Sequence, residues 1–516
     1  MKNITTLPEI EILSGNSKLL SATMKQIDSI KIIQKLSVPS LCEIDFSTYE
    51  KQMSSAASAS ALNSATKKLI PGSEITIKIK GEATPLFYGT VTATEYSYAS
   101  DGSSSIKVRA FDPLFKLCKN QKIYTYIHSS VVDIAKELIK GHKIIPKNSA
   151  IPVWERIVQY NETDNDFLAR VAQRSGHYYF FYENSVQISN LDVKEPFCEL
   201  QIGDNLLECN IDANSMYSLK SVYSSGWDPF MGEIHEETVS DSNSGSSVNY
   251  TFSDDVKQFA GERKLVDIAI RNSSEAKTVS QAEMDRCKAG EININGVADG
   301  DSALYPGTCI LINGVAREFC GKYNLTEVTH ILNSRYGYIT KFSTIPPDFR
   351  SKDQGTNATF GTVTDINDPE KIGRVKVLLD TYMENETDWM NVVLPSSGLS
   401  KGIVMLPDTE DRVLVLFLNN DPARGVVIGG ISTQSGESHK WGIEDGKVEQ
   451  FHFISPKGQT ISLDDKNKKI RMENIEGSYV EIGPKKVMVH SKTDLTIEAP
   501  GQTITICGKN IDFKKG

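Results

Sequence analysis

The sequence lacks the patterns that enzymes and metal proteins commonly show. Its eight cysteines include no C-x-x-C pair and its eight histidines no H-x-x-x-H pair, so neither a zinc site nor a disulfide framework is readable. It contains no G-x-S-x-G nucleophile motif and no P-loop. The acids Asp464, Asp465, Asp368 and Glu370 lie in turn contexts and indicate no catalytic pair. We therefore expect no catalytic residue, no metal site, no cofactor and no enzymatic activity.

Charge and hydropathy disfavour two further classes. A net charge of −10 argues against a general nucleic-acid-binding surface. The longest apolar run, 413–418, is too short to cross a bilayer, and the first six residues lack the apolar core of a signal peptide. We expect a protein of three or four domains that is assembled in the cytoplasm without a cleaved signal.

A short repeat stands out in residues 459–513. An apolar pair at positions i and i+2 recurs there seven times, with first members 9, 10, 7, 8, 9 and 7 residues apart. Six of the seven residues inside the pairs are polar, an alternation typical of β-strands, because successive strand side chains point to opposite faces. Each repeat predicts one short strand and a turn. The pairs are Ile461/Leu463, Ile470/Met472, Val480/Ile482, Val487/Val489, Leu495/Ile497, Ile504/Ile506 and Ile511/Phe513.

Such a repeat is too short for a single-chain solenoid, which needs about 20 or more residues per turn to enclose an interior. If the fourteen apolar side chains stayed in water, the chain would forgo about 1.5–3 kcal/mol for each, roughly 20–40 kcal/mol in all. Association of copies removes this cost and pairs the open strand edges. We predict an intertwined trimeric β-helix, or β-prism, whose core is these fourteen residues. The alternative is an antiparallel meander packed on the rest of the chain.

Residues 1–350 are predicted to be rich in strands. Alternation with turn punctuation in the first 111 residues is typical of a β-barrel. Small and polar residues near 54–66 and near 240–247 predict loops or insertions. The strands expected in the first barrel are 9–12, 29–32, 42–46, 74–79, 87–91 and 106–109.

Helices are predicted at three places within this β-rich region. The first follows a capping box at Ser130, the second begins after the cap Thr163, and the third lies within 273–289. The aromatic run 178–182 belongs to a predicted hairpin, and we expect it in a core rather than in a ligand site.

The remaining chain divides into three parts. Short strands between 357 and 432 predict a small barrel of the OB type, with too few aromatic and basic residues for nucleic-acid binding. Residues 433–448 are predicted to be a linker that is too short to hold an active site. Residues 449–516 form the predicted triple-stranded β-helix. The expected class is mainly β, with β-barrels and inserted helices, an OB-fold domain and a C-terminal intertwined trimeric β-helix.

An ordered set of short motifs resembles the VgrG spike proteins of contractile injection systems. The set is specific because its members occur in the family's order along nearly the whole chain, although each motif alone is weak. The motifs are residues 158–164 (VQYNETD), 167–170 (FLAR), 176–179 (GHYY), 304–307 (LYPG), 361–364 (GTVT), 373–377 (GRVKV), 388–389 (DW), 406–407 (LP), 411–415 (DRVLV) and 420–422 (NDP).

The resemblance implies a homotrimer that fuses the equivalents of the phage hub and needle proteins. Two barrel-like hub domains per chain would form a pseudo-sixfold ring that adapts a sixfold tube to a threefold spike. The implied partners are an Hcp-like tail-tube protein, a PAAR-type tip protein, baseplate proteins, effector cargo and, transiently, the target membrane. The protein would leave the cell within the injection particle, of either a type VI secretion system or an extracellular phage-tail-like system.

Two alternative functions are open at this point. A trimeric tailspike-like polysaccharide depolymerase would need a longer single-chain β-helix with acidic clefts. A static adhesin would not need the hub region. The histidine after Val489, His490, is expected to project outward from the β-prism, which argues against a metal site on the axis.

Overall fold

The computed structural model divides the chain into two compact units, and each is described by itself. The first unit comprises residues 1–405 and 413–429, and the second comprises 406–412 and 430–516. The predicted loop near 54–66 lies outside the described residues except for Thr66. The described residues are 8–48, 66–100, 103–147, 151–193, 195–228, 233–266, 270–348, 355–383, 385–399, 401–431 and 442–514.

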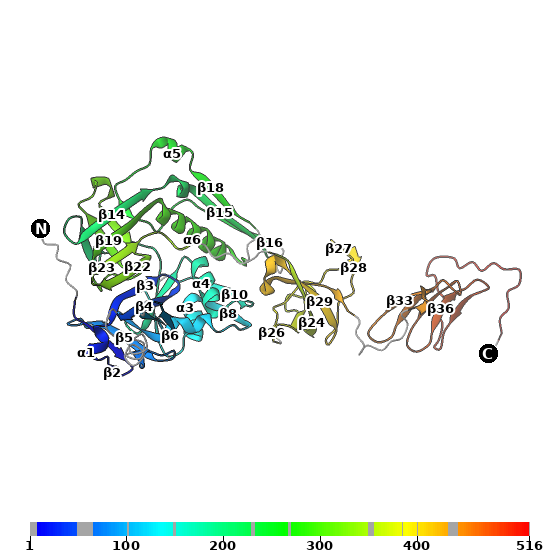
Figure 1. The fold of residues 1–516 in the computed structure, drawn as a ribbon. Coiled ribbons are helices and arrows are strands. Elements are labelled where there is room, and N and C mark those ends of the chain that lie inside the picture. Colours follow the sequence, from blue (N-terminus) through cyan, green and yellow to red (C-terminus); the bar gives the residue numbers. More distant parts are fainter. Residues whose placement is uncertain are drawn as a thin grey trace. The chain divides into compact units, whose positions relative to one another are not determined.

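An eleven-stranded sheet dominates the first unit (Figure 1). Its order is β14-β19-β23-β22-β3-β4-β7-β6-β5-β1-β2, so strands from the two ends of the hub region pair directly at β3 and β22. All six strands predicted in the first barrel are confirmed. The sheet comprises β1 (Ile10–Ser14), β2 (Ser17–Lys18), β3 (Ile27–Lys35), β4 (Val38–Thr48), β5 (Glu74–Ile79), β6 (Phe87–Tyr98), β7 (Ser104–Phe111), β14 (Leu206–Ala213), β19 (Ile292–Asp299), β22 (Glu327–Asn333) and β23 (Gly337–Ser343).

Alternation along these strands fills one face of the sheet with buried aliphatic residues. In the antiparallel register Ile30 lies opposite Ile44 and Ile32 opposite Cys42, and all four are buried in one core cluster. The mainly β class is confirmed. Closure of this sheet into barrels stays a prediction, because β14 and β2 are its two ends in the printed order.

The helices begin where the capping signals predicted them. Ser130 and Asp133 form a complete capping box, and the Thr163 hydroxyl accepts a hydrogen bond from the Asp166 N–H at 3.1 Å. The helix that begins after Thr163 ends in a Schellman motif. Gly176 has a φ of +69°, and the His177 N–H donates to the Ala172 carbonyl. The helices are α1 (Ser21–Met24), α3 (Val131–Leu138), α4 (Asp164–Arg174), α5 (Asp254–Gln258) and α6 (Ser273–Glu291), with 3-10 turns η1 (Pro113–Cys118), η2 (Ser215–Tyr217), η3 (Arg317–Phe319), η4 (Leu418–Asn420) and η5 (Pro422–Arg424).

The first unit also contains four small sheets, and strands of three of them contact α3, α4 or α6. The aromatic run is strand β11, which pairs with β12 as predicted, and its first four side chains are buried. The polar segment near 240–247 is exposed or half-buried and is held to α6 through Asp285, which accepts from the Asn243 N–H at 2.8 Å. The strands are β8 (Tyr124–Ser130), β9 (Lys143–Pro146), β10 (Val153–Gln159), β11 (Tyr178–Tyr182), β12 (Ser185–Ser189), β13 (Cys198–Gln201), β15 (Leu219–Asp228), β16 (Glu233–Val239), β17 (Ser247–Val248), β18 (Gly261–Leu265), β20 (Cys309–Asn313) and β21 (Gly321–Asn324).

The region predicted as an OB fold contains a five-stranded sheet in the order β26-β25-β24-β29-β30. Its inner face is apolar because inward and outward residues alternate, with Val413, Val415 and Phe417 of β29 fully buried. The strands are β24 (Asn357–Asp365), β25 (Lys376–Leu379), β26 (Asn385–Glu386), β29 (Arg412–Phe417) and β30 (Gly425–Gly430), followed by the separate hairpin β27 (Ser396–Gly398) and β28 (Lys401–Ile403).

The second unit is an antiparallel five-stranded meander preceded by a short hairpin. The hairpin, β31 (Ile443–Glu444) and β32 (Lys447–Val448), falls inside the predicted linker. No helix among the described residues has both the length and the hydropathy needed to span a bilayer. The meander comprises β33 (Gln450–Ile454), β34 (Thr460–Asp464), β35 (Lys469–Glu473), β36 (Tyr479–Ile482) and β37 (Val487–His490).

Candidate functional site

The meander of the second unit brings the repeated apolar pairs onto one face. Residues that lie directly opposite in an antiparallel pair point to the same side of the sheet, so the register defines two apolar rows across all five strands. The first row is Phe453, Ile461, Met472, Val480 and Val489, and the second is Phe451, Leu463, Ile470, Ile482 and Val487. We call these ten residues the apolar face.

The apolar face is largely uncovered within one chain. Nine of its ten side chains are exposed, among them Ile482 at 49% and Val489 at 58%, and Leu463 is half-buried. A contiguous apolar patch of this kind on a soluble chain marks an interaction surface. The connectivity of the five strands is that of an antiparallel meander.

The opposite face of the same sheet is polar and pairs its own charges. The Arg471 guanidinium donates to Glu473 at 2.9 Å and to Glu481 at 3.1 Å, while Lys469 lies 3.6 Å from Glu481. Arg471 also covers the ring of Tyr479 at 3.7 Å. The hydrogen bonds from Arg471 to Glu473, and then to Glu481, raise the pKa of Arg471. The charged side chains of the polar face are therefore paired within one chain. Nine of the ten side chains of the apolar face are exposed instead.

His490 lies on the polar face, as predicted. It follows Val489 by one position, so its ring projects to the other side of β37 and stacks on Tyr479 with ring centroids 4.9 Å apart. The side chain is therefore directed away from the apolar rows.

Two residues of the apolar face were missed by sequence reasoning. Phe451 and Phe453 lie on β33 opposite Leu463 and Ile461, and they are 55% and 52% exposed. They form an i, i+2 apolar pair around the polar His452, the same signal that marks the later pairs. The repeat therefore begins about ten residues earlier than predicted.

The last three predicted pairs lie outside any strand of the single chain. Residues 491–514 contain no assigned strand, and the apolar side chains there are exposed. Strands require a neighbour to satisfy their backbone groups, and one chain offers this segment no pairing partner among the described residues. A core role for these six residues stays a prediction. The residues are Leu495, Ile497, Ile504, Ile506, Ile511 and Phe513.

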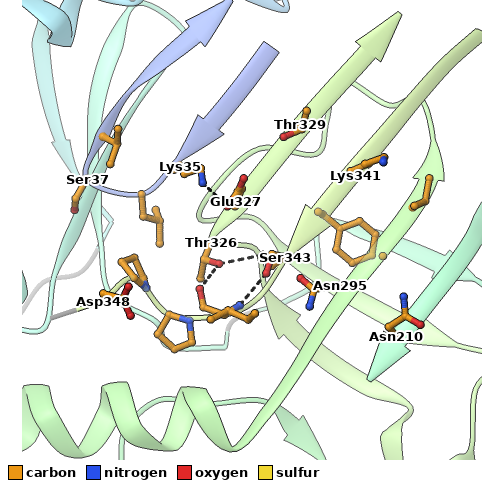
Figure 2. Close-up of a pocket in the computed structure, with 18 of the residues that line it drawn as sticks. Lys35, Ser37, Asn210, Asn295, Thr326, Glu327, Thr329, Lys341, Ser343 and Asp348 are labelled. Carbon is orange, nitrogen blue, oxygen red and sulfur yellow. Dashed lines mark hydrogen bonds and ion pairs between the residues drawn. The ribbon is translucent and has the colours of Figure 1, made fainter. Parts of the chain in front are cut away.

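The first unit contains a separate groove with a volume of about 720 Å³ on one face of the large sheet. Figure 2 shows its cross-strand row, in which Asn210, Asn295, Ser343, Glu327 and Lys35 follow one another over five strands. Glu327 and Lys35 neutralise each other in an ion pair of 2.8 Å. Two acids, Glu327 and Asp348, line the groove together with Lys35 and Lys341.

Buried titratable groups in the first unit have structural partners. Burial raises the pKa of Asp112 to about 7, although its carboxylate accepts hydrogen bonds from the Ser40 and Leu114 N–H groups at 2.8 and 3.0 Å. Burial lowers the pKa of His330 to about 4. Among the residues that the structure describes, no group of three or more His, Cys, Asp or Glu side chains is arranged to hold a metal ion.

Two family models match consecutive regions of the chain. Residues 6–334 match the family model described as the Alg8 N-terminal domain. Residues 359–431 match the model described as the type VI secretion system/phage-baseplate injector OB domain. No curated protein matches the chain.

Two solved structures share the fold over nearly the whole chain. A chain of the lidded Francisella PdpA-VgrG complex aligns with a TM-score of 0.56 and 10% identity, covering 95% of this chain and 81% of that chain. The lidless PdpA-VgrG complex gives a TM-score of 0.55 and 11% identity, covering 95% of this chain and 100% of that chain. The resemblance to VgrG proteins that the motifs indicate is confirmed in fold. The chain belongs to the family of the Alg8 N-terminal domain, carries a baseplate-injector OB domain after it and has the VgrG fold.

Proposed function

We propose that this protein is the spike and hub of a contractile injection system and that three copies assemble through the apolar face of the C-terminal sheet. The observation that carries the proposal is the contrast between the two faces of that sheet. The polar face pairs Arg471 with Glu473 and Glu481 inside one chain, and the apolar face leaves nine large side chains exposed. Copies that turn their apolar faces inward bury these rows and keep the charges in water.

The same association gives the last three apolar pairs a role. In an intertwined trimer each open strand edge pairs with a neighbouring copy, so residues 491–514 gain the backbone partners that one chain does not provide. The product is a rod with a dry axis and continuous backbone pairing. Such a rod resists bending, because its hydrogen bonds and apolar contacts break cooperatively.

The mechanical role has three parts. The hub caps the inner tube and adapts its sixfold symmetry to the threefold spike, the OB domain forms the collar, and the spike punctures the target envelope. The family match over 6–334 and the injector OB domain over 359–431 support this placement. We propose an Hcp-like tube protein, a PAAR-type tip and baseplate proteins as partners, with effector cargo carried into the target. The protein would act without catalysis.

The assembly is tested by placing charges in the apolar rows. Ile482→Asp combined with Val489→Asp would bury like charges from three copies, and an unpaired buried carboxylate is strongly unfavourable. We expect the double variant to abolish trimers in light scattering while the first unit stays folded by circular dichroism.

The matched control adds the same charge to the polar face. Ser462→Asp with His490→Asp changes two residues whose side chains point away from the apolar rows, and we expect this variant to remain trimeric. Trimers that survive in the Ile482/Val489 variant, or a wild-type protein that is monomeric at every concentration, would overturn the proposal.

A further inference from the structure

Several of the motifs that run through the sequence meet at one place in the structure. The motif 158–164 covers the end of β10 in the hub and the residues that follow it. The motifs 388–389 and 420–422 belong to the OB region. All of them fall in the first compact unit. Their convergence on the junction between hub and OB domain assigns them a common task that sequence order alone does not show.

We propose that Arg271 and Arg156 are positioning residues of a fixed joint that locks the OB domain onto the hub. Arg271 precedes helix α6, and its guanidinium reaches two separate OB segments. It donates to the Asp388 carboxylate at 2.8 Å and to the Ala423 carbonyl at 3.0 Å. One side chain therefore bridges the segment that follows β26 and the 3-10 turn η5 of the OB domain.

A second arginine and a hydroxyl–amide pair extend the joint along the sheet of β8 and β10. Arg156 of β10 donates to the Glu386 carbonyl at 2.8 Å, and its guanidinium lies 3.9 Å from Asp388. Thr125 of β8 and Asn385 are joined by side-chain hydrogen bonds of 2.6 and 3.0 Å. Three points that do not lie on one strand define an orientation, so the contacts restrict rotation as well as separation.

The apolar part of the joint shares a core. Val158 and Tyr160 of the hub belong to the same buried cluster as Val377 and Val415 of the OB sheet. The ring of Tyr160 lies 5.9 Å from that of Tyr382. Side chains of one domain that complete the core of another cannot leave without opening a cavity. This explains why the hub motif contains an aromatic residue at this position.

The backbone that carries both arginines is itself held in place. Glu275 of α6 accepts from the Arg271 N–H at 3.0 Å with one oxygen and from the Glu155 N–H at 3.1 Å with the other. Asn272 caps α6 and donates to the Glu155 carboxylate at 3.2 Å. Helix α6 and strand β10 are thus tied together next to the two guanidinium groups. Arg156 therefore lies on a strand, and Arg271 lies in the bend before α6 that these hydrogen bonds hold in place.

The joint makes hub and OB domain one body. Its mechanical meaning rests on the proposed function, because a spike can transmit the force of injection only if the collar does not swivel on the hub. The geometric statement is independent of that function. It requires only that the orientation of the OB domain relative to the hub depend on Arg271, Arg156 and Asp388.

The joint can be tested by measuring a distance distribution in the full chain. Spin labels carried by unnatural amino acids at Met216 of the hub and Ile372 of the OB domain sit at exposed positions, 81% and 58% exposed. Labelled copies diluted with unlabelled copies remove distances between copies. We expect a narrow distribution in the wild type and a distribution at least twice as wide in Arg271→Ala. Arg271→Lys keeps the charge but not the two-pronged reach, and it should fall between them.

A second variant and a control separate orientation from stability. Asp388→Asn keeps the size of the side chain, removes its charge, and should also widen the distribution. The control Arg374→Ala removes a buried ion pair between Arg374 and Asp368, which lie 2.6 Å apart. Both residues of this pair belong to the OB domain. Its distribution should stay narrow at temperatures where it is folded.

The outcomes distinguish the joint from the proposed function. An unchanged width in both Arg271→Ala and Asp388→Asn overturns the joint, even if the wild-type protein is trimeric. A widened distribution in a wild-type background that is monomeric upholds the joint while the spike proposal fails. Widening in Arg374→Ala equal to that in Arg271→Ala would also overturn the joint, because the effect would then reflect loss of OB stability.

Discussion

Two strand pairs of this protein follow the same local rules and end in opposite environments. In the hub, Ile30 lies opposite Ile44, and each is 1% exposed. In the C-terminal sheet, Ile470 lies opposite Ile482, and they are 42% and 49% exposed. Both pairs are antiparallel and alternate apolar with polar residues. The alternation therefore predicts that a strand has one apolar and one polar face. It does not predict which part of the protein, or which partner, covers the apolar face.

The difference lies in what each sheet has on its apolar side. The hub sheet supplies a buried cluster from many of its own strands, including Ile75, Val91 and Val108. The C-terminal sheet has no second layer among the described residues of its unit, and its charges are gathered on the other face by Arg471. An exposed apolar face of this kind is typical of an interaction surface.

The largest expected effect comes from truncating a residue in each region. Ile44→Ala leaves a cavity in a closed core and should lower the free energy of unfolding of the first unit by about 2–5 kcal/mol. Ile482→Ala should leave that free energy unchanged and weaken trimers instead. Denaturant titration followed by probes in each unit measures both. Equal losses in the first unit would remove the distinction between the two regions.

A smaller effect is expected at the edge of the apolar face. Phe451→Ser with Phe453→Ser removes two half-exposed rings that trimerisation would finish burying, so we expect association to weaken roughly tenfold or more. Sedimentation over a concentration series measures the change. His452→Ser, between them on the polar face, is the matched control and should leave association within error of wild type.

The smallest effect is a pH dependence confined to the first unit. Burial alone would raise the pKa of Asp368, but the hydrogen bonds from Arg374 and from backbone N–H groups outweigh it and lower the pKa to about 2. A depressed pKa gives stability that is present above the unfolded value of about 4 and lost as the pH falls through about 2. Thermal unfolding should show this loss. Asp368→Asn should flatten it, and an unchanged slope would contradict the assignment.

Much of the local structure could be predicted from sequence. The capping box at Ser130, the cap at Thr163 and the aromatic strand 178–182 each rest on interactions between near neighbours, and the structure contains all three. The first four apolar pairs of the repeat likewise form strands β34 to β37. These features depend on spacing along the chain, which a sequence displays directly.

Long-range pairing could not be predicted in the same way. The contact between β3 and β22 joins segments about 300 residues apart, and neither strand carries a sequence signal that identifies the other as its partner. Arg271 lies outside every recognised motif, although its two OB partners lie in or beside them. Phe451 and Phe453 carry the same i, i+2 signal but lie before residue 459, where the predicted repeat begins. The last three pairs form no strand in the single chain, and their pairing with other copies stays a prediction.

Hydrogen exchange on the intact wild-type protein, combined with its mass in solution, tests the central claim most directly. We expect three copies per particle and slow exchange of the amides in 495–513, because those strands would be paired between chains. Dilution or the Ile482/Val489 variant should release the copies and make the same amides exchange fast. A single copy with these amides already protected would contradict the account.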